Sequence, residues 1–420
     1  MIKSTEIKKI IIFFILSLIF ILINRDYYLI PFIKNYQESL PSMATYLYSY
    51  GNIFREDLFF IIPKYLNCNL EIVKSDSSWT NIYYLLFTPL VKIFGTNYLP
   101  GRLFPIILNL IGLYLIIRSQ SQKFSIIIFS SFLIFCSSFK DGLAFNFHDS
   151  LFLLLIGIFL ILKKNDANQF KIFLFILISA VTIHYSLIFY FFYFLTEKLL
   201  KDLDKKKFLI HFCYLLFLSI LIILLFNYFY NYDFEKILMR VNEKFWIFDK
   251  SFIFGNIKQD SIIRMVYLFY AEIRDNLGLI IIPLYLYSII YFIKKNPDIL
   301  IINISTILFY IFFAKQIIPH NFMMLLFLTI VLLTSLKFID CFFQNKRLIK
   351  NLVFLSIIIN MLLTNFYNPT TYQLNTSLVN LDNDQTRNIS KDELLIDKKK
   401  MNHICYFYLE KILKKKVLIN

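Results

Sequence analysis

Long apolar runs recur along almost the whole chain, and short polar or basic segments separate them. Of the 420 residues, 58% are hydrophobic and 17% are charged, and the mean hydropathy is +0.63. A typical soluble domain is about 45–50% apolar and about 25% charged. A water-soluble fold of this length could not bury so much apolar surface. The sequence therefore excludes a soluble enzyme with a membrane anchor, a disordered chain and a coiled coil, and predicts a polytopic membrane protein.

The lengths of the apolar runs predict an all-α, polytopic transmembrane helical bundle of about eleven spans. Numbers of spans from about ten to about thirteen are compatible with the sequence. The basic lead of the first run is similar to a signal peptide, but no small-residue cleavage site follows, so we expect an uncleaved helix. A further run, Tyr83–Phe94, is compatible with a span, a re-entrant helix or an interfacial helix. The expected spans are Ile10–Ile23, Leu103–Ile117, Phe124–Ser138, Leu151–Leu162, Ile172–His184, Tyr185–Leu195, Phe208–Phe229, Leu279–Ile293, Ile299–Phe313, Phe322–Leu336 and Leu352–Phe366.

The distribution of basic residues predicts the orientation of these spans. With the N-terminus inside, the inside segments carry 19 Lys and Arg, whereas the short outside connections carry two, Lys140 and Lys315. Because Lys and Arg in short loops mark the cytoplasmic side, the N-terminus is expected in the cytoplasm. We therefore predict a bacterial cytoplasmic (inner) membrane protein. The inside segments are the start, Arg118–Lys123, Lys163–Lys171, Lys198–Lys207, Lys294–Lys295 and Lys337–Lys350.

The hydrophilic stretches predict how the rest of the chain is organised. Residues 1–367 form the transmembrane domain, with two long extracytoplasmic loops at 25–102 and at about 230–277. The second loop carries charges of both signs. It is either a solvated amphipathic loop or part of an acceptor site. Residues 368–420 form a hydrophilic tail with a short amphipathic helix at Ile404–Leu413. Eleven spans place this tail outside, although its lysines suit the inside.

Several classes of function require sequence motifs that this chain does not contain. The chain has no Walker loop, no G-x-G-x-x-G, no H-E-x-x-H and no G-x-S-x-G sequence. With 8 Gly a backbone cradle for nucleotide phosphates is not expected, which argues against ATP-driven transport. The five Cys are scattered singly, without the spacing of a zinc site. The net charge of +16 is spread over short segments between apolar runs, so no nucleic-acid partner is expected.

The first long loop carries the most informative pattern. Glu38 stands just before a short helix-like stretch that Gly51 ends, and Asp57 follows it. An aromatic and aliphatic run then ends at Phe94-Gly95, and Arg102-Leu103 opens the next span. These residues resemble the first loop of the GT-C superfamily of integral membrane glycosyltransferases. The resemblance covers about the first 160 residues in detail.

This resemblance implies a transfer of sugar from a polyprenyl-phosphate donor, of the mannosyltransferase or arabinosyltransferase type. The acceptor would be an extracytoplasmic glycan, lipid or protein. Such a reaction needs a base for the acceptor hydroxyl and support for the leaving phosphate. Glu38 is the candidate base, with Asp57 as the alternative base or a metal ligand, and Arg102 would hold the phosphate. The resemblance also implies short membrane-surface helices in the first loop.

Further polar residues fall at predicted outer ends of spans. His148 and Asp149 are candidates for binding the acceptor or a metal, and Asp149 is equally suited to cap the following helix. His184 and His320 are candidate substrate-binding residues on the same outside face, or interfacial structural residues. A divalent cation, Mg²⁺ or Mn²⁺, is compatible with the reaction, but nothing in the sequence requires it.

Two alternatives remain open at this stage. An O-antigen-type polysaccharide polymerase also has many spans and a large outside loop, although its main loop usually falls late in the chain. A multi-pass transporter or flippase for a glycan or lipid belongs to a different class. Transporters tend to show internal repeats and helices broken by Gly or Pro, and neither feature is prominent here.

Overall fold

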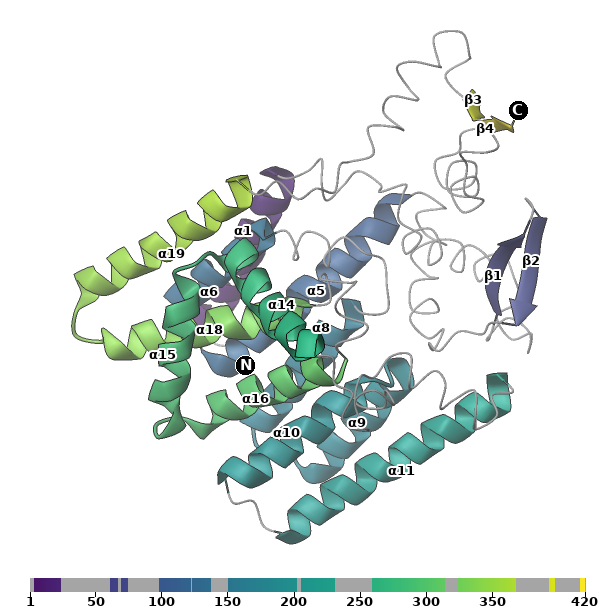
Figure 1. Ribbon diagram of the computed structural model, residues 1–420, viewed down its shortest axis with the longest axis horizontal. Coiled ribbons are helices and arrows are strands. Elements are labelled where there is room, and N and C mark those ends of the chain that lie inside the picture. The colour runs from purple at the N-terminus through teal and green to yellow at the C-terminus, as the bar shows by residue number, and fades with distance from the viewer. Residues whose placement is uncertain are drawn as a thin grey trace. The chain divides into compact units, whose positions relative to one another are not determined.

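The computed structural model describes residues 4–23, 61–66, 69–74, 98–121, 123–136, 150–201, 205–230, 259–313, 324–367, 393–396 and 416–419. The described residues form twelve α-helices and one 3-10 helix, together with four short strands (Figure 1). The helices are α1 (Ser4–Ile23), α5 (Tyr98–Gln120), α6 (Phe124–Ser131), η1 (Phe132–Phe135), α8 (Ser150–Lys164), α9 (Gln169–Thr182), α10 (Ser186–Lys201), α11 (Lys205–Tyr230), α14 (Gln259–Leu277), α15 (Ile281–Ile293), α16 (Pro297–Phe312), α18 (Leu325–Phe342) and α19 (Arg347–Tyr367).

The chain divides into two compact units. Unit 1 comprises residues 1–23, 109–142 and 152–369, and unit 2 comprises residues 24–108, 143–151 and 370–420. Unit 2 contains an antiparallel pair, β1 (Ile61–Leu66) with β2 (Asn69–Lys74), and a parallel pair, β3 (Glu393–Ile396) with β4 (Lys416–Ile419). The sequence predicts no strand in these hydrophilic stretches. The expected surface helices of the first loop and the tail helix at Ile404–Leu413 lie outside the described residues.

Each of the eleven predicted apolar runs coincides with a helix. The closely spaced runs Ile172–His184 and Tyr185–Leu195 form two separate helices, α9 and α10, on either side of a turn. Within the described residues, four helices are long and apolar enough to cross a membrane, or five if the bent pair of α14 and α15 is one span. The helical membrane architecture is therefore supported, whereas the count of eleven spans stays a prediction because several helices are short.

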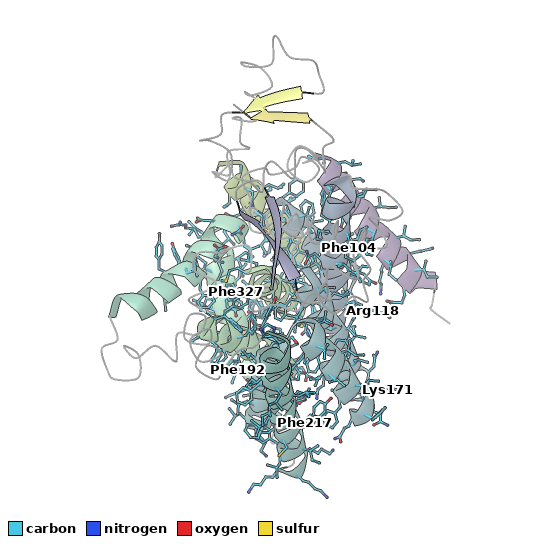
Figure 2. All side chains as sticks on the ribbon, turned by 90° about the vertical axis from the view of Figure 1, so that its right-hand side faces the viewer. Phe104, Arg118, Lys171, Phe192, Phe217 and Phe327 are labelled. Carbon is cyan, nitrogen blue, oxygen red and sulfur yellow. The ribbon has the colours of Figure 1, made fainter. Side chains whose placement is uncertain are left out.

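The helices of unit 1 differ in how much of their surface is buried, and this difference distinguishes a central helix from peripheral ones. In α18 83% of the membrane-length window is buried, whereas the windows of α11 and α19 are 22% and 17% buried. Large apolar side chains are exposed on both helices, such as Phe217 on α11 (Figure 2). Leu352 is an example on α19. Water would make such surfaces prone to aggregation, but lipid tails solvate them. The distribution suits a bundle whose centre is protein and whose surroundings are hydrocarbon.

Packing around α18 explains this arrangement. α15 and α16 both pack against α18, and α10 packs against the other side of α16. α9, α10 and α11 lie side by side (Figure 1), while α14 packs against α19. Because residues 325–336 of α18 are mostly apolar and all buried, helices can cover this part of α18 in every direction.

Two glycines allow α5 and α8 to touch backbone to backbone. A Cβ atom at Gly112 would lie 2.5 Å from the backbone carbon of Leu153, and one at Gly157 would lie 2.8 Å from the carbonyl oxygen of Gly112. Small residues bring membrane helices close, so that dispersion contacts hold them together. The contact therefore needs glycine at both positions.

The second predicted loop, at about residues 230–277, contains a helix. Residues 259–277 form α14, and the chain bends by 115° between α14 and α15. The charged residues of this segment belong to an amphipathic helix that packs against α19. Residues 231–258 lie outside the described residues.

Candidate functional site

Few of the candidate site residues predicted from the sequence lie within the described part of the structure. Glu38, Asp57, His148, Asp149 and His320 lie outside the described residues. Arg102 lies near the start of α5, where the backbone alone is described. His184 lies in the turn between α9 and α10. The nominated residues are therefore not brought together in the described part of the chain, and their roles stay predictions.

Unit 1 has two chemically different ends. At one end, which we call the charged end, ion pairs join the start of α1, the ends of α5, α8, α10 and α18, and the starts of α16 and α19. These are the chain segments that the distribution of Lys and Arg assigns to one side of the membrane. The helix directions therefore agree with alternating spans, and the cytoplasmic location of this end stays a prediction.

The most buried carboxylate of the charged end belongs to Asp340. This residue on α18 is 3% exposed, and its two oxygens accept hydrogen bonds from Lys123, which precedes α6, and from Lys350 on α19. The Lys350 Nζ atom lies 3.3 Å from Oδ1. Three segments are thus held at one carboxylate, which offsets the cost of burying its charge.

A second buried pair holds the ends of α8 and α10 together. Lys163 Nζ lies 2.9 Å from Glu197 Oε2, and the ammonium group also lies over the rings of Tyr193 and Phe194. Glu197 is 5% exposed. The ring faces supply additional stabilisation of the lysine charge.

The start of α1 shows how these charges act on one another. Lys9 donates a hydrogen bond to Glu6 at 2.8 Å, and Arg118 lies 3.9 Å from the second carboxylate oxygen. The hydrogen bond from Lys9 is the main cause that lowers the pKa of Glu6 below its usual 4.5. Burial, followed by repulsion from Arg118, lowers the pKa of Lys164, whose Nζ donates to the Arg118 carbonyl oxygen at 2.8 Å.

At the opposite end of unit 1, the described residues join helices mainly through side-chain amides, next to a local ion pair between Arg274 and Asp275. We call it the amide end and define it by Cys136, Glu272, Asn276, Asn360 and Asn365. It lies at the far ends of helices whose other ends belong to the charged end, since α19 begins at the charged end and Asn365 stands near its last residue.

The amide end is built around the last turn of α14. The final carbonyl groups of a helix have no partner within it, and lipid offers none. Here Asn365 Nδ2 and Cys136 Sγ donate to the carbonyl oxygen of Asn276, at 3.0 and 3.1 Å. Asn360 Nδ2 donates to the carbonyl oxygen of Leu277 at 3.2 Å. The end of η1 and the last turns of α19 thus cap α14.

Gly278 makes the sharp bend after α14 possible. Its φ angle of +85° lies in the left-handed region, and its N–H donates to the carbonyl oxygens of Ile273 and Arg274. This is the conformation in which glycine commonly ends helices. A Cβ atom there would also lie 1.6 Å from Asn360 Nδ2.

Glu272 is the carboxylate of the amide end. It is 7% exposed, and its Oε2 accepts a hydrogen bond from Asn276 Nδ2 at 2.9 Å. In the sequence this residue is one of the mixed charges of the second long loop, and in the structure it is buried near the end of α14. The spacing of four between Glu272 and Asn276, the helical period, was the signal that could have singled out the pair. Carboxylates and amides of this kind hydrogen-bond hydroxyl groups.

His184 borders an aromatic layer at the same end of the bundle. Its ring is 6.0 Å from that of Tyr185, which in turn contacts Phe152, Phe309 and Phe313. The layer continues through Tyr310 on α16 and Phe327 on α18 to Phe269 on α14. Four helices, α8, α14, α16 and α18, thus share one apolar layer with the turn before α10.

The described residues contain no group of three His, Cys, Asp or Glu side chains that could hold a metal ion. Comparisons with protein-family models, with curated proteins and with solved structures gave no match. The residues therefore define a class: a helical protein with several helices able to span a membrane.

Proposed function

We propose that this protein is a membrane glycosyltransferase that transfers a sugar from a polyprenyl-phosphate donor to an extracytoplasmic glycan, lipid or protein. The observation that supports it best is the difference between the two ends of unit 1. The charged end coincides with the segments predicted to be cytoplasmic, and the amide end offers a buried carboxylate, amides and an aromatic layer. Such groups suit a polar acceptor that arrives from the outer side.

The first-loop pattern adds the second support for this proposal. Glu38 and Asp57 belong to the predicted outer side, and Arg102 opens the span that follows the loop. Among the classes considered, the GT-C glycosyltransferases combine a first-loop carboxylate with many helical spans. The transporter alternative gains no comparable support from these residues.

The proposed reaction is an in-line displacement at the anomeric carbon of the donor sugar. The acceptor hydroxyl oxygen forms the new bond to this carbon while the bond from the carbon to the phosphate oxygen breaks. Glu38 or Asp57 receives the hydroxyl proton. The polyprenyl phosphate leaves with the electron pair, and Arg102 stabilises its charge.

Mass-spectrometric profiling of lipid-linked glycans in membranes that contain each variant tests the proposal. Glu38→Gln and Asp57→Asn remove a carboxylate with little change in size, and Glu6→Gln at the charged end is the matched control. We expect the product to fall at least about a hundredfold in the variant that lacks the base, and to remain at the wild-type level in Glu6→Gln.

The pattern of products also separates the alternatives. Unchanged product in both loop variants would overturn the assignment of the base. Loss of long glycan chains with single-sugar addition intact would indicate a polymerase. Accumulation of a complete lipid-linked glycan on the cytoplasmic side would indicate a flippase.

A further inference from the structure

The two faces of α14 differ in their exposure and in their chemistry. The structure describes the side chains of this helix from residue 266 onward. The face that packs against α18 and α19 is polar in part, since Glu272 and Asn276 are 7% and 2% exposed. The opposite, outward face carries Tyr267 and Tyr270, which are 58% and 40% exposed. The two tyrosines are three residues apart, so they are neighbours on the helix surface.

A charged pair continues the outward face. Arg274, four residues after Tyr270, donates from Nε and Nη2 to the two carboxylate oxygens of Asp275, at 2.6 and 3.0 Å. Its guanidinium carbon lies 5.6 Å from the centre of the Tyr270 ring. Both charged side chains are more than a third exposed. The outward face thus presents aromatic rings, hydroxyl groups and charges of both signs.

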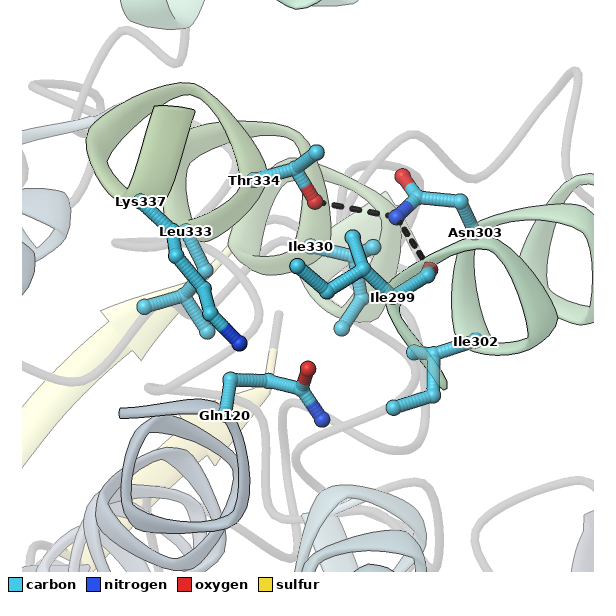
Figure 3. A pocket seen from close by; sticks show the side chains of 8 residues that line it. All are labelled: Gln120, Ile299, Ile302, Asn303, Ile330, Leu333, Thr334 and Lys337. Atoms are coloured by element: carbon cyan, nitrogen blue, oxygen red, sulfur yellow. Dashed lines mark hydrogen bonds between the residues drawn. The ribbon is translucent and has the colours of Figure 1, made fainter. Parts of the chain in front are cut away.

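A tyrosine in the interior of the bundle is held differently. Tyr285 on α15 is buried, and its hydroxyl group donates to Asn303 Oδ1 at 2.9 Å. Asn303 Nδ2 in turn donates to the Ile299 carbonyl oxygen and to Thr334 Oγ1, at 2.7 and 2.9 Å (Figure 3). Buried hydroxyl and amide groups need such partners within the protein. The exposed tyrosines of α14 instead suit surroundings that offer polar partners themselves.

The exposed face of the next helix, α15, is mostly aliphatic. Leu286, Ile290 and Ile293 are each more than half exposed, and Tyr287 is the exposed tyrosine among them. Hydrocarbon solvates a face of this kind, whereas water would favour its aggregation. The change from tyrosines and charges to aliphatic side chains occurs at the bend of Gly278. The two helices therefore suit different layers of a bilayer.

The bend also gives the direction of α14. The chain turns by 115° between the helices, so their axes are inclined to each other by 180° − 115° = 65°. When α15 crosses the bilayer with the usual tilt of about 20°, α14 lies closer to the membrane plane than to its normal. The composition of α14 agrees with this direction, because its 19 residues include five charged ones, which is too many for a hydrocarbon span. They are Asp260, Arg264, Glu272, Arg274 and Asp275.

We propose that α14 is an interfacial helix whose outward face binds the lipid headgroups of the predicted outer leaflet, and that the span begins with α15. Tyrosines gather at this level of a membrane because an apolar ring and a polar hydroxyl group are both satisfied there. The pair of Arg274 and Asp275 complements the phosphate and ammonium groups of a zwitterionic headgroup. Since Glu272 and Asn276 belong to the same turns, the helix holds the amide end at headgroup depth. This inference is independent of the proposed function.

Depth-dependent fluorescence quenching tests the proposal on the full chain in nanodiscs of phosphatidylcholine. Trp79 and Trp246 are first replaced by Phe, and Tyr267→Trp or Tyr270→Trp then supplies the one fluorophore. Tyr287→Trp is the matched control, because this tyrosine of α15 is 65% exposed and lies about 14 Å beyond the bend at 1.5 Å per residue. Three quenchers are compared: iodide in the water, bromine on the acyl chains near the headgroup, and bromine near the chain ends.

The bromine near the headgroup should quench both α14 tryptophans at least about twofold more than the deep bromine, because interfacial helices lie about 5–10 Å into the boundary between headgroups and acyl chains. The order should be reversed for Tyr287→Trp. If one α14 variant does not fold, the other carries the test, and Val266→Trp adds a third exposed position.

Three results would overturn the proposal. Stronger quenching of the α14 tryptophans by the deep bromine would show that α14 is part of a span. Quenching by iodide alone would show that its outward face lies in water. No quenching by any of the three agents would show that protein covers this face.

Discussion

The two ends of unit 1 hold their helices together by different means. The charged end uses ammonium and carboxylate groups, as at Asp340, whereas the amide end uses neutral donors on the carbonyl groups of α14. Ion pairs tolerate some movement, because the lysine stems are long and partly solvated. Amide caps depend on short side chains and on a fixed backbone bend. We therefore expect the amide end to be more sensitive to small changes of shape, and the charged end to changes of pH and salt.

The largest effect is expected at Gly112, where α5 and α8 meet between the two ends. Gly112→Ala places a Cβ atom against backbone atoms, which cannot move aside independently. The helices must separate, at a cost of about 3 kcal/mol. Thermal unfolding in detergent measures this loss. Because both helices end at the charged end, the contact between Arg118 and Lys164 should loosen while hydrogen exchange at α14 stays unchanged. Equal loosening at the charged end and at α14 would contradict the expectation that the two ends respond differently.

The next effect is expected at Gly278 in the amide end. Gly278→Ala forces a side chain into the left-handed region and displaces Asn360 from the Leu277 carbonyl oxygen. Together these changes cost about 2 kcal/mol. In the double variant with Asn360→Ala the clash is absent, so the two substitutions should destabilise by less than the sum of their separate effects. Strict additivity in thermal unfolding would show that Asn360 does not constrain this bend.

A smaller effect is expected for Asp340→Asn at the charged end. The substitution keeps the size of the side chain but removes the partner of Lys123 and Lys350. Because Lys123 is 57% exposed and can turn to solvent, we expect a loss of about 1 kcal/mol. High salt should reduce the difference between the variant and the wild type. Lys346→Met, which removes an exposed lysine, is the control and should leave thermal unfolding unchanged.

The smallest effect is expected from the titration of Glu6. The folded-state pKa of Glu6 lies below its usual 4.5, so its pair with Lys9 adds stability above about pH 4.5. This stability is lost as the pH falls through the lowered pKa. Glu6→Gln should therefore lower the unfolding temperature slightly at pH 7, and this difference should vanish once the pH lies below the lowered pKa. A difference that stays constant as the pH falls would exclude this pair as its cause.

The positions of the helices were predictable because lipid restricts a chain to few solutions. Without water to satisfy the backbone, a long apolar segment must form a helix. The eleven predicted runs accordingly coincide with helices, even where α9 and α10 are separated by a short turn at His184. The gathering of the basic segments at one end was also predictable, since the positions of Lys and Arg follow the sides of the membrane.

The candidate site was less predictable, because its chemistry depends on which helix faces are buried. Glu272 and Arg274 were two charges among several in a loop. Their local sequences resemble those of solvated charges. The packing of α14 against α18 and α19 makes the two residues different, since Glu272 is buried and Arg274 is partly exposed.

The sequence by itself determined a helical membrane protein, the places of its helices and the segments that share one side. These properties depend on hydropathy and charge, which act over a single segment. Only the tertiary structure decided that Gly112 meets Gly157, that Asn360 and Asn365 cap α14, and that Tyr267 and Tyr270 face outward from the helix that buries Glu272. The physical reason is that close contacts join residues far apart in the chain, whose mutual positions no local pattern encodes.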